Sequence, residues 1–396
     1  IDYIRTPIAK FQGGLSEVRA DDLAAIVLKE IVKRNPQIPA EEIEDVILGC
    51  ANQAGEDNRN VARMASLLAE LPIKIGGETV NRLCASGMAA ISNAYRAIAI
   101  GEGDFYIAGG VEQMTRAPYV LSKSAQPFGR DVQLFDSSFG WRFVNPKMKE
   151  LYGVDGMGET AENIAEIYKI SREAQDEFAL HSQQKATSAQ NSGRLAQEIV
   201  NVEIPQKKGE PKIFSQDEFV KPDTTLDKLA KLRPAFKKEG GSVTAGNSSG
   251  LNDGAAAMIL ASEDAVKKYN LKPLAKIISS AVVGVEPRIM GIGPVEATKK
   301  ALSRANLSLE DMDIIELNEA FAAQALSVLQ ELGIDAKDER LNPNGGAIAL
   351  GHPLGMSGTR IVGTAALELQ KKNKKYALCT LCIGVGQGYA MIIEKI

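Results

Sequence analysis

Two short stretches of this sequence correspond to each other: Leu83-Cys84-Ala-Ser-Gly-Met88 and Gly351-His352-Pro-Leu-Gly-Met-Ser-Gly358. The cysteine lies 39 residues after Asp45, and the histidine lies 39 residues after Asp313. In each half, an acidic helical stretch leads into an apolar strand, and the quoted stretch is followed by a helical pattern and a further strand. This agreement in spacing predicts a duplicated α/β unit.

Short runs of Val, Ile and Ala alternate with longer helical patterns along the whole chain, which is typical of α/β proteins. We expect strands at Asp45–Gly49, Glu78–Leu83, Phe105–Gly109, Ile314–Leu317 and Tyr376–Cys382, and a helix at Ala62–Leu71. If a pseudo-twofold axis relates the two halves, their matching turns face one another. The duplication then brings the cysteine and the histidine together.

The segment between the halves breaks this pattern and is interpreted as an inserted domain. It contains amphipathic helices at Glu159–Lys169 and Arg172–Gly193, and a lysine-rich stretch at Val220–Lys238. The lysines fit either a solvated surface or a phosphate-binding lid. The predicted division assigns residues 1–114 with 244–268 to the first half, 115–243 to the insertion, and 269–396 to the second half.

Composition excludes several classes of protein. The chain of 396 residues carries 46 basic and 50 acidic side chains, a net charge of −4 that gives no basic surface for nucleic acid. No apolar run reaches the roughly 18 to 20 residues of a membrane helix. Four cysteines are too few for a disulfide scaffold, and the first residues show no secretory signal, so we expect a reduced, cytoplasmic protein without membrane or nucleic-acid partners.

Cys84 has the setting of a catalytic nucleophile. It follows an expected strand and opens a helix, and both a helix N-terminus and a nearby imidazole lower the pKa of a thiol. The alternative is a small buried apolar side chain. The pairing with His352, whose ring is carried on a turn stiffened by Pro353, favours the nucleophile. His181 lies on a polar helix and is expected to face water.

Two further motifs lie at expected strand ends. Asn318-Glu-Ala-Phe places an amide and a carboxylate after one strand, and Cys382-Ile-Gly-Val-Gly-Gln-Gly offers glycine backbone for close approach of a substrate. A strand rather than a helix follows these glycines, which argues against a dinucleotide loop. The pair Cys379 and Cys382 lacks a second ligand pair at metal spacing, so no metal is expected.

These motifs together resemble the thiolase family over essentially the whole chain. The resemblance rests on Asn81-Arg-Leu-Cys-Ala-Ser-Gly, Asn318-Glu-Ala-Phe-Ala, Asn344-Gly-Gly-Ala-Ile-Ala-Leu-Gly-His-Pro and Cys382-Ile-Gly. It implies two similar halves, each with a mixed five-stranded sheet, stacked in five layers α-β-α-β-α with a loop domain inserted in the first half. It also implies a homodimer or homotetramer.

The resemblance further implies a role for each matching residue. Cys84 would take up the acyl group, His352 would activate it, and Cys382 would move the proton at the substrate α-carbon. Asn318 would hold a water that binds the thioester oxygen together with His352, and the N–H groups of Cys84 and Gly384 would form a second oxyanion hole. Coenzyme A is then a substrate, and no cofactor is needed.

The family pattern also maps a binding region for coenzyme A onto the insertion and the residues after it. These positions are Met157, Lys221, Leu232, Phe236, Ala245, Ser249, Leu251 and Phe321.

Within the family, the sequence is similar to 3-oxoadipyl-CoA thiolases through Arg130–Pro146 and Gly384–Gly388, and it has Gly156 where acetoacetyl-CoA enzymes typically have histidine. Arg142 would pair with the distal carboxylate of a dicarboxylic acyl group. The expected activity is that of a 3-ketoacyl-CoA thiolase, an acetyl-CoA C-acyltransferase. The alternatives are an acetyl-CoA C-acetyltransferase acting on acetoacetyl-CoA, a non-catalytic acyl-CoA or sterol carrier, and a ketoacyl synthase.

Overall fold

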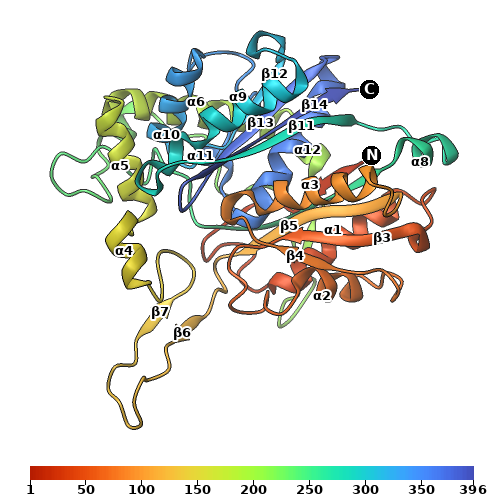
Figure 1. Ribbon diagram of the computed structural model, residues 1–396, viewed down its shortest axis with the longest axis horizontal. Coiled ribbons are helices and arrows are strands. Elements are labelled where there is room, and N and C mark those ends of the chain that lie inside the picture. Colours follow the sequence, from red (N-terminus) through yellow and green to blue (C-terminus); the bar gives the residue numbers. More distant parts are fainter.

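The computed structural model describes all 396 residues and contains two stacked β-sheets with helices between and outside them (Figure 1). The first sheet has the order β1-β10-β5-β3-β4, with β2 paired to β10, and the second has the order β11-β14-β13-β12. The first sheet consists of β1 Tyr3–Arg5, β2 Ala9–Lys10, β3 Ile43–Gly49, β4 Glu78–Val80, β5 Phe105–Gln113 and β10 Asn252–Ala261. The second consists of β11 Ala275–Gly284, β12 Ile314–Leu317, β13 Tyr376–Ile383 and β14 Gln387–Lys395.

The helices form three layers around these sheets. Helices α1 (Ala20–Arg34) and α2 (Val61–Leu68) cover the first sheet on its outer side, and α9 (Gly293–Ala305) covers the second. Helices α3 (Ser86–Ala99) and α12 (Leu354–Lys372) pack together between the sheets. The predicted five-layered α-β-α-β-α arrangement is confirmed.

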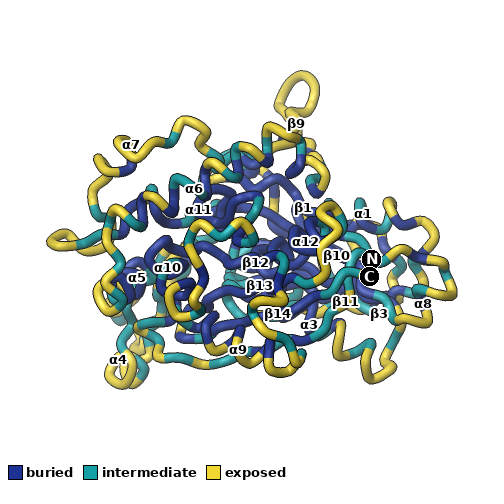
Figure 2. The backbone as a smooth tube through the Cα atoms, turned by 90° about the horizontal axis from the view of Figure 1, so that it is seen from above, coloured by how far each residue is buried: buried dark blue, intermediate teal, exposed yellow.

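The central helix α12 is buried over most of its length, as Figure 2 shows for the interior of the molecule. A Cβ atom at Gly358 would lie 2.4 Å from the backbone nitrogen of Met88 on α3, closer than any real contact allows. Glycine at this position therefore lets the two central helices approach. Both helices begin at the same end of the sandwich, where Cys84 and His352 lie.

The strand predictions are confirmed for β3, β5, β12 and β13, and one is shortened. The strand expected over Glu78–Leu83 ends at Val80, because Leu83 has a left-handed backbone (φ 46°) and residues 83–85 form a 3₁₀ turn.

The expectation of five strands in each sheet is wrong for both sheets, because the first has six with the short β2 and the second has four. Where β4 pairs with β3 in the first half, the second half has a single bridge between Ile315 and Leu341. The Asn342 side chain then takes the place of the backbone ladder, since it accepts from the N–H of Leu317 and donates to the carbonyl of Leu317 at 2.9 Å each.

The inserted segment forms helices and two hairpins. Its hairpins are β6 (Tyr119–Leu121) with β7 (Leu134–Asp136) and β8 (Val202–Ile204) with β9 (Lys212–Phe214), and the first hairpin projects from the body (Figure 1). The predicted long helices appear as α5 (Met157–Ile167) and α6 (Arg172–Asn191). The insertion also contains the short helices α4 Pro146–Tyr152 and α7 Leu226–Ala230. The remaining α-helices, which lie after the insertion, are α8 Glu263–Lys268, α10 Ala322–Leu332 and α11 Ala347–Leu350. The long helices α5 and α6 pack against α10 of the second half, and α6 also packs against α11.

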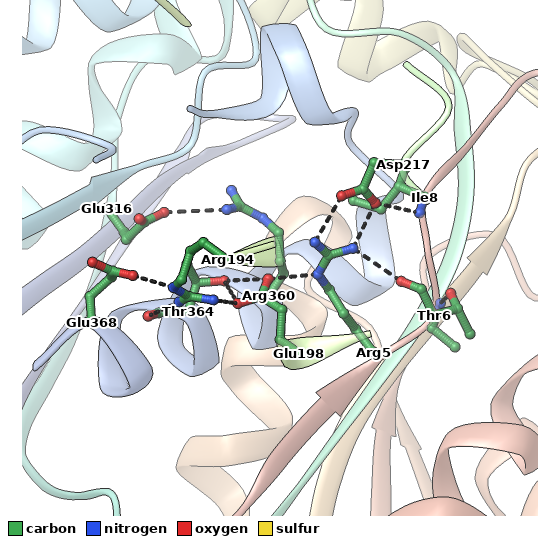
Figure 3. Close-up of polar contacts among 11 residues, drawn as sticks. Arg5, Thr6, Ile8, Arg194, Glu198, Asp217, Glu316, Arg360, Thr364 and Glu368 are labelled. Carbon is green, nitrogen blue, oxygen red and sulfur yellow. Dashed lines mark hydrogen bonds and ion pairs between the residues drawn. The ribbon is translucent and has the colours of Figure 1, made fainter. Parts of the chain in front are cut away.

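A buried ionic network ties both halves and the insertion together (Figure 3). Arg5 on β1 donates to Glu198 at 2.7 Å and holds Asp217 with two bonds at 2.7 and 2.9 Å. Arg194 donates to Glu198 and to Glu368 of α12. Nearer the start of α12, Arg360 donates to Glu316 of β12 at 3.3 Å, and burial raises the pKa of Glu316 to about 7. The network fixes α12 against elements from every part of the chain.

Candidate active site

Turns at one end of the sandwich bring four of the five predicted catalytic residues to a single cavity of about 600 Å³. Cys84 comes from the turn before α3, His352 from the residues before α12, Cys382 from the end of β13, and Gly384 from the turn between β13 and β14. Asn318, which follows β12, is buried beside the imidazole Nε2 and is not among the residues of the cavity wall.

The turn that carries Cys84 is held by its own motif. The side chain of Asn81 accepts from the N–H of Leu83 at 2.9 Å, and the Ser86 hydroxyl donates to the carbonyl of Leu83 at 2.6 Å. These bonds support the left-handed backbone of Leu83, a conformation that costs energy in a non-glycine residue. The Asn-Arg-Leu-Cys-Ala-Ser motif therefore fixes where the sulfur points.

Burial raises the pKa of Cys84 to about 11, and the Gly384 N–H, which donates to the sulfur, offsets only part of this effect. The prediction that the helix N-terminus and the imidazole lower this pKa is thus wrong for the resting site. The cysteine lies in a 3₁₀ turn ahead of α3, and removal of the thiol from water dominates. The sulfur rests as a neutral thiol.

His352 is held from three sides. Its Nε2 lies 3.4 Å from Asn318 Nδ2, its Nδ1 lies 2.6 Å from the Ser357 hydroxyl, and its backbone N–H donates to Asn252 at 2.9 Å. Burial and, secondarily, the Arg360 guanidinium lower the pKa of His352 to about 3. The imidazole is therefore neutral at physiological pH and is able to accept a proton.

Cys382 is buried, and burial together with the adjacent Cys84 raises the pKa of its thiol well above the usual range. Cys50 does not line the cavity; its thiol donates to Asp57 at 3.4 Å. Cys50, Asp57 and Glu112 lie within 4.8 Å of one another, but backbone N–H groups occupy both carboxylates. Cys84 and Cys382 are the two cysteines of the cavity.

The predicted substrate-binding residues divide into two groups. Those that line the catalytic cavity are Arg142, Met157, Phe236, Ser249, Leu251 and Phe321. Lys221 instead lines a separate polar groove beside α6, with its ammonium over the ring of Phe219. Leu232 and Ala245 are exposed outside the cavity wall. Assignment of these residues to coenzyme A remains a prediction.

Sequence reasoning missed three polar residues that the tertiary structure brings to the site: Asn52, Glu112 and Ser357. The first two lie in the loop after β3 and near the end of β5, with no motif of their own. Ser357 offered one usable signal, because it stands five residues after the histidine at the start of a helix.

The comparisons with known proteins agree with this geometry. Residues 1–264 match the thiolase N-terminal domain, and residues 271–395 match the thiolase C-terminal domain. The chain is 60% identical to the 3-oxoadipyl-CoA/3-oxo-5,6-dehydrosuberyl-CoA thiolase of Escherichia coli K12, over 100% of this chain and 98% of that protein. It is 58% identical to a beta-ketoadipyl-CoA thiolase of Acinetobacter baylyi, with the same coverage.

A solved structure shows the same fold. The acetyl-CoA acetyltransferase of Bacillus anthracis superposes with a TM-score of 0.92 at 42% identity, over 100% of this chain and 98% of that one. None of the helices in the present structure combines the length and apolar character that crossing a membrane would require.

Proposed function

The chain belongs to the thiolase family of acyltransferases, and we propose that it cleaves 3-oxoadipyl-CoA with coenzyme A to acetyl-CoA and a dicarboxylic acyl-CoA that is shorter by two carbons. The names of its relatives support this substrate. The structural observation that supports this substrate is the unpaired positive charge of Arg142.

Arg142 places an unpaired positive charge on the wall of the catalytic cavity. Its guanidinium donates to the side-chain oxygen of Asn52 at 2.8 Å and to the carbonyl of Ser137 at 3.3 Å, and both acceptors are neutral. No carboxylate accepts a hydrogen bond from this guanidinium. A terminal carboxylate of the substrate would complete this site through a charge-assisted bond.

Gly156 supports an acyl group longer than acetoacetyl. It lines the same cavity and contributes no side chain, whereas a histidine at this position would project from the start of α5 and narrow the space. The same cavity therefore offers both space for an extended acyl tail and a cation that would pair with its terminal carboxylate.

In the proposed reaction, the Cys84 sulfur attacks the 3-keto carbon while its proton passes to the neutral imidazole of His352. The bond between C2 and C3 then breaks, and the electron pair moves to C2 as the enolate of acetyl-CoA. Cys382 delivers a proton to C2. A second molecule of coenzyme A gives its thiol proton to Cys382, attacks the acyl group on Cys84 and releases the shortened acyl-CoA, while His352 returns its proton to Cys84.

The negative oxygens of these steps need donors. The N–H groups of Cys84 and Gly384 would bind the oxygen of the acyl-enzyme, since the Gly384 N–H already points at the Cys84 sulfur. His352, together with a water held by Asn318, would bind the enolate oxygen. Thiol, imidazole and amide groups account for every step, so we propose that no metal or prosthetic group takes part.

We also propose that the enzyme is a cytoplasmic homodimer or homotetramer. Apolar residues on the projecting hairpin of β6 and β7 support self-association, with Tyr119 72% exposed and Leu121 and Leu134 each 65% exposed. Molar mass from light scattering in solution tests this proposal, and a monomer would contradict it.

The substrate is tested by thiolysis of 3-oxoadipyl-CoA, acetoacetyl-CoA and a medium-chain 3-ketoacyl-CoA in parallel. We expect the highest kcat/KM for 3-oxoadipyl-CoA. Arg142→Ala should lower this value by roughly 10- to 150-fold, because a charge-assisted bond contributes about 1.5 to 3 kcal/mol, and should spare acetoacetyl-CoA. A wild-type preference for acetoacetyl-CoA would instead support the acetyltransferase activity.

A further inference from the structure

Asn52 connects the proposed carboxylate site to the catalytic framework. Its backbone N–H donates to Glu112 at 3.0 Å, and its side-chain oxygen accepts from Arg142 at 2.8 Å. Glu112 lies near the end of β5 and is 2% exposed. The loop after β3 thus anchors on a rigid strand and holds a side chain that comes from the inserted domain.

The same carboxylate also reaches the element that carries the imidazole. Glu112 accepts from the N–H of Gly355 in the first turn of α12 at 2.8 Å, and from the N–H of Ala51 at 3.0 Å. One buried acidic side chain therefore sets both the start of the helix that follows His352 and the loop that carries Asn52. Because Glu112 contacts both segments, it fixes the distance between the His352 imidazole and Asn52, which anchors Arg142.

The contacts of Arg142 leave most of its donors free. Guanidinium carries five N–H groups, and two of them are engaged, by Asn52 and by the carbonyl of Ser137. Asn52 also donates to the Ser137 hydroxyl at 3.4 Å, which closes a ring of three residues. Because the acceptors in this ring are uncharged, the ring orients the cation and leaves its charge available.

We propose that Asn52 is a specificity-determining positioning residue, which turns the Arg142 guanidinium toward the terminal carboxylate of the acyl group without neutralising it. This inference rests on the proposed function. An aspartate at this position would pair with Arg142 and cancel the charge, so a neutral amide is the side chain that both holds the cation and leaves it unpaired.

The test is Asn52→Asp, assayed with 3-oxoadipyl-CoA and acetoacetyl-CoA beside Arg142→Ala. We expect the ratio of kcat/KM for the two substrates to fall by roughly 10- to 150-fold in both variants. The loss should appear mainly as a higher KM for 3-oxoadipyl-CoA, because contact with a remote tail is made equally in the ground state and the transition state. A merely structural disturbance would lower kcat for both substrates.

Asn58→Asp is the matched control, since it adds the same charge to an exposed asparagine in the loop before α2, outside the cavity wall. It should leave the ratio unchanged. Asn52→Ala adds no charge beside Glu112 and serves if the aspartate variant does not fold; we expect it to lower the ratio by several-fold because Arg142 loses one of its two anchors.

The outcomes separate the two proposals. If Arg142→Ala lowers the ratio and neither Asn52 variant does, Asn52 does not position the cation, and this inference alone is overturned. If Arg142→Ala leaves the ratio unchanged in an enzyme that prefers 3-oxoadipyl-CoA, the carboxylate is bound elsewhere. The proposed roles of Arg142 and Asn52 are then both overturned. If the wild-type enzyme does not prefer 3-oxoadipyl-CoA, the proposed substrate is wrong.

Discussion

The Nδ1 atom of His352 lies 2.6 Å from the hydroxyl oxygen of Ser357, and that hydroxyl donates its single proton to the carbonyl of Pro353 at 2.9 Å. With the hydroxyl proton assigned to the Pro353 carbonyl, the proton of the neutral ring is assigned to Nδ1, which donates to Ser357. Nε2 is left without a proton, beside the amide of Asn318. In the proposed mechanism, Ser357 favours the tautomer that accepts the proton of Cys84.

Replacement of Ser357 by alanine should lower kcat by roughly 2- to 10-fold with little change in KM, because one neutral hydrogen bond contributes about 0.5 to 1.5 kcal/mol. Steady-state thiolysis measures this effect. Ser327→Ala is the control, since Ser327 is equally buried in α10 and bonds only to the carbonyl of Gln324. An equal loss in both variants would assign the effect to packing.

Cys84→Ser should form little covalent adduct when it is mixed with acyl-CoA, because a hydroxyl is a far weaker nucleophile than a thiol that a base deprotonates. Intact-protein mass spectrometry measures the acyl-enzyme. Cys50→Ala removes a cysteine that does not line the cavity and should accumulate the adduct normally. Normal adduct in Cys84→Ser would rule out this nucleophile.

The raised pKa of Cys84, about 11, predicts how its alkylation depends on pH. Below its pKa the thiolate fraction increases tenfold for each unit of pH, so inactivation by iodoacetamide should still be accelerating at about pH 9, above the ordinary pKa of ~8.5. Peptide mapping checks that Cys84 carries the label. A rate that levels off near pH 7 would mean that the resting site holds a thiolate and imidazolium pair.

Cys382→Ala should still take up an acetyl group from acetyl-CoA but lose condensation and thiolysis, because these reactions need a proton moved at the α-carbon. We expect kcat to fall by roughly 10²- to 10⁴-fold. Cys379→Ala is the matched control on the same strand, since the Cys379 thiol points to the carbonyl of Ile361 outside the cavity. Unchanged thiolysis in Cys382→Ala would reject the role.

Arg5→Ala should lower the free energy of unfolding by about 3 to 5 kcal/mol, because it leaves Glu198 and Asp217 as buried charges without their shared partner. Denaturant unfolding measures the loss. Lys29→Ala breaks the ion pair with Glu70, whose two side chains are 61% and 76% exposed, and should cost under about 1 kcal/mol. Similar losses in both variants would show that burial does not govern the Arg5 network.

The sequence alone was sufficient for the duplicated architecture, and four of the five residues that it predicted to be catalytic lie at one cavity. Cys84, His352 and Cys382 lie at turns whose glycine, proline and serine neighbours determine the local backbone. Such signals are local, so they are readable along the chain. The equal spacing in the two halves added the one long-range relationship that was needed.

Other features depend on contacts between segments far apart in the chain. Burial in the folded chain raises the pKa of Cys84, whereas sequence reasoning relied on the helix terminus to lower it. The second sheet ends at four strands because one side chain, Asn342, occupies the hydrogen bonds of a neighbouring strand. No periodicity in the sequence predicts that a side chain takes the place of a strand in this way.

The proposed carboxylate site is the clearest example of what only tertiary structure decided. Arg142 in the insertion donates to Asn52, which lies 90 residues earlier in the chain. Glu112 in turn links the loop of Asn52 to Gly355 of α12, which lies 243 residues after Glu112. Sequence identified Arg142 by its residue type but gave no partner for it. Its charge is available to a substrate because the folded chain surrounds it with neutral acceptors, and this is a property of three-dimensional packing rather than of any segment.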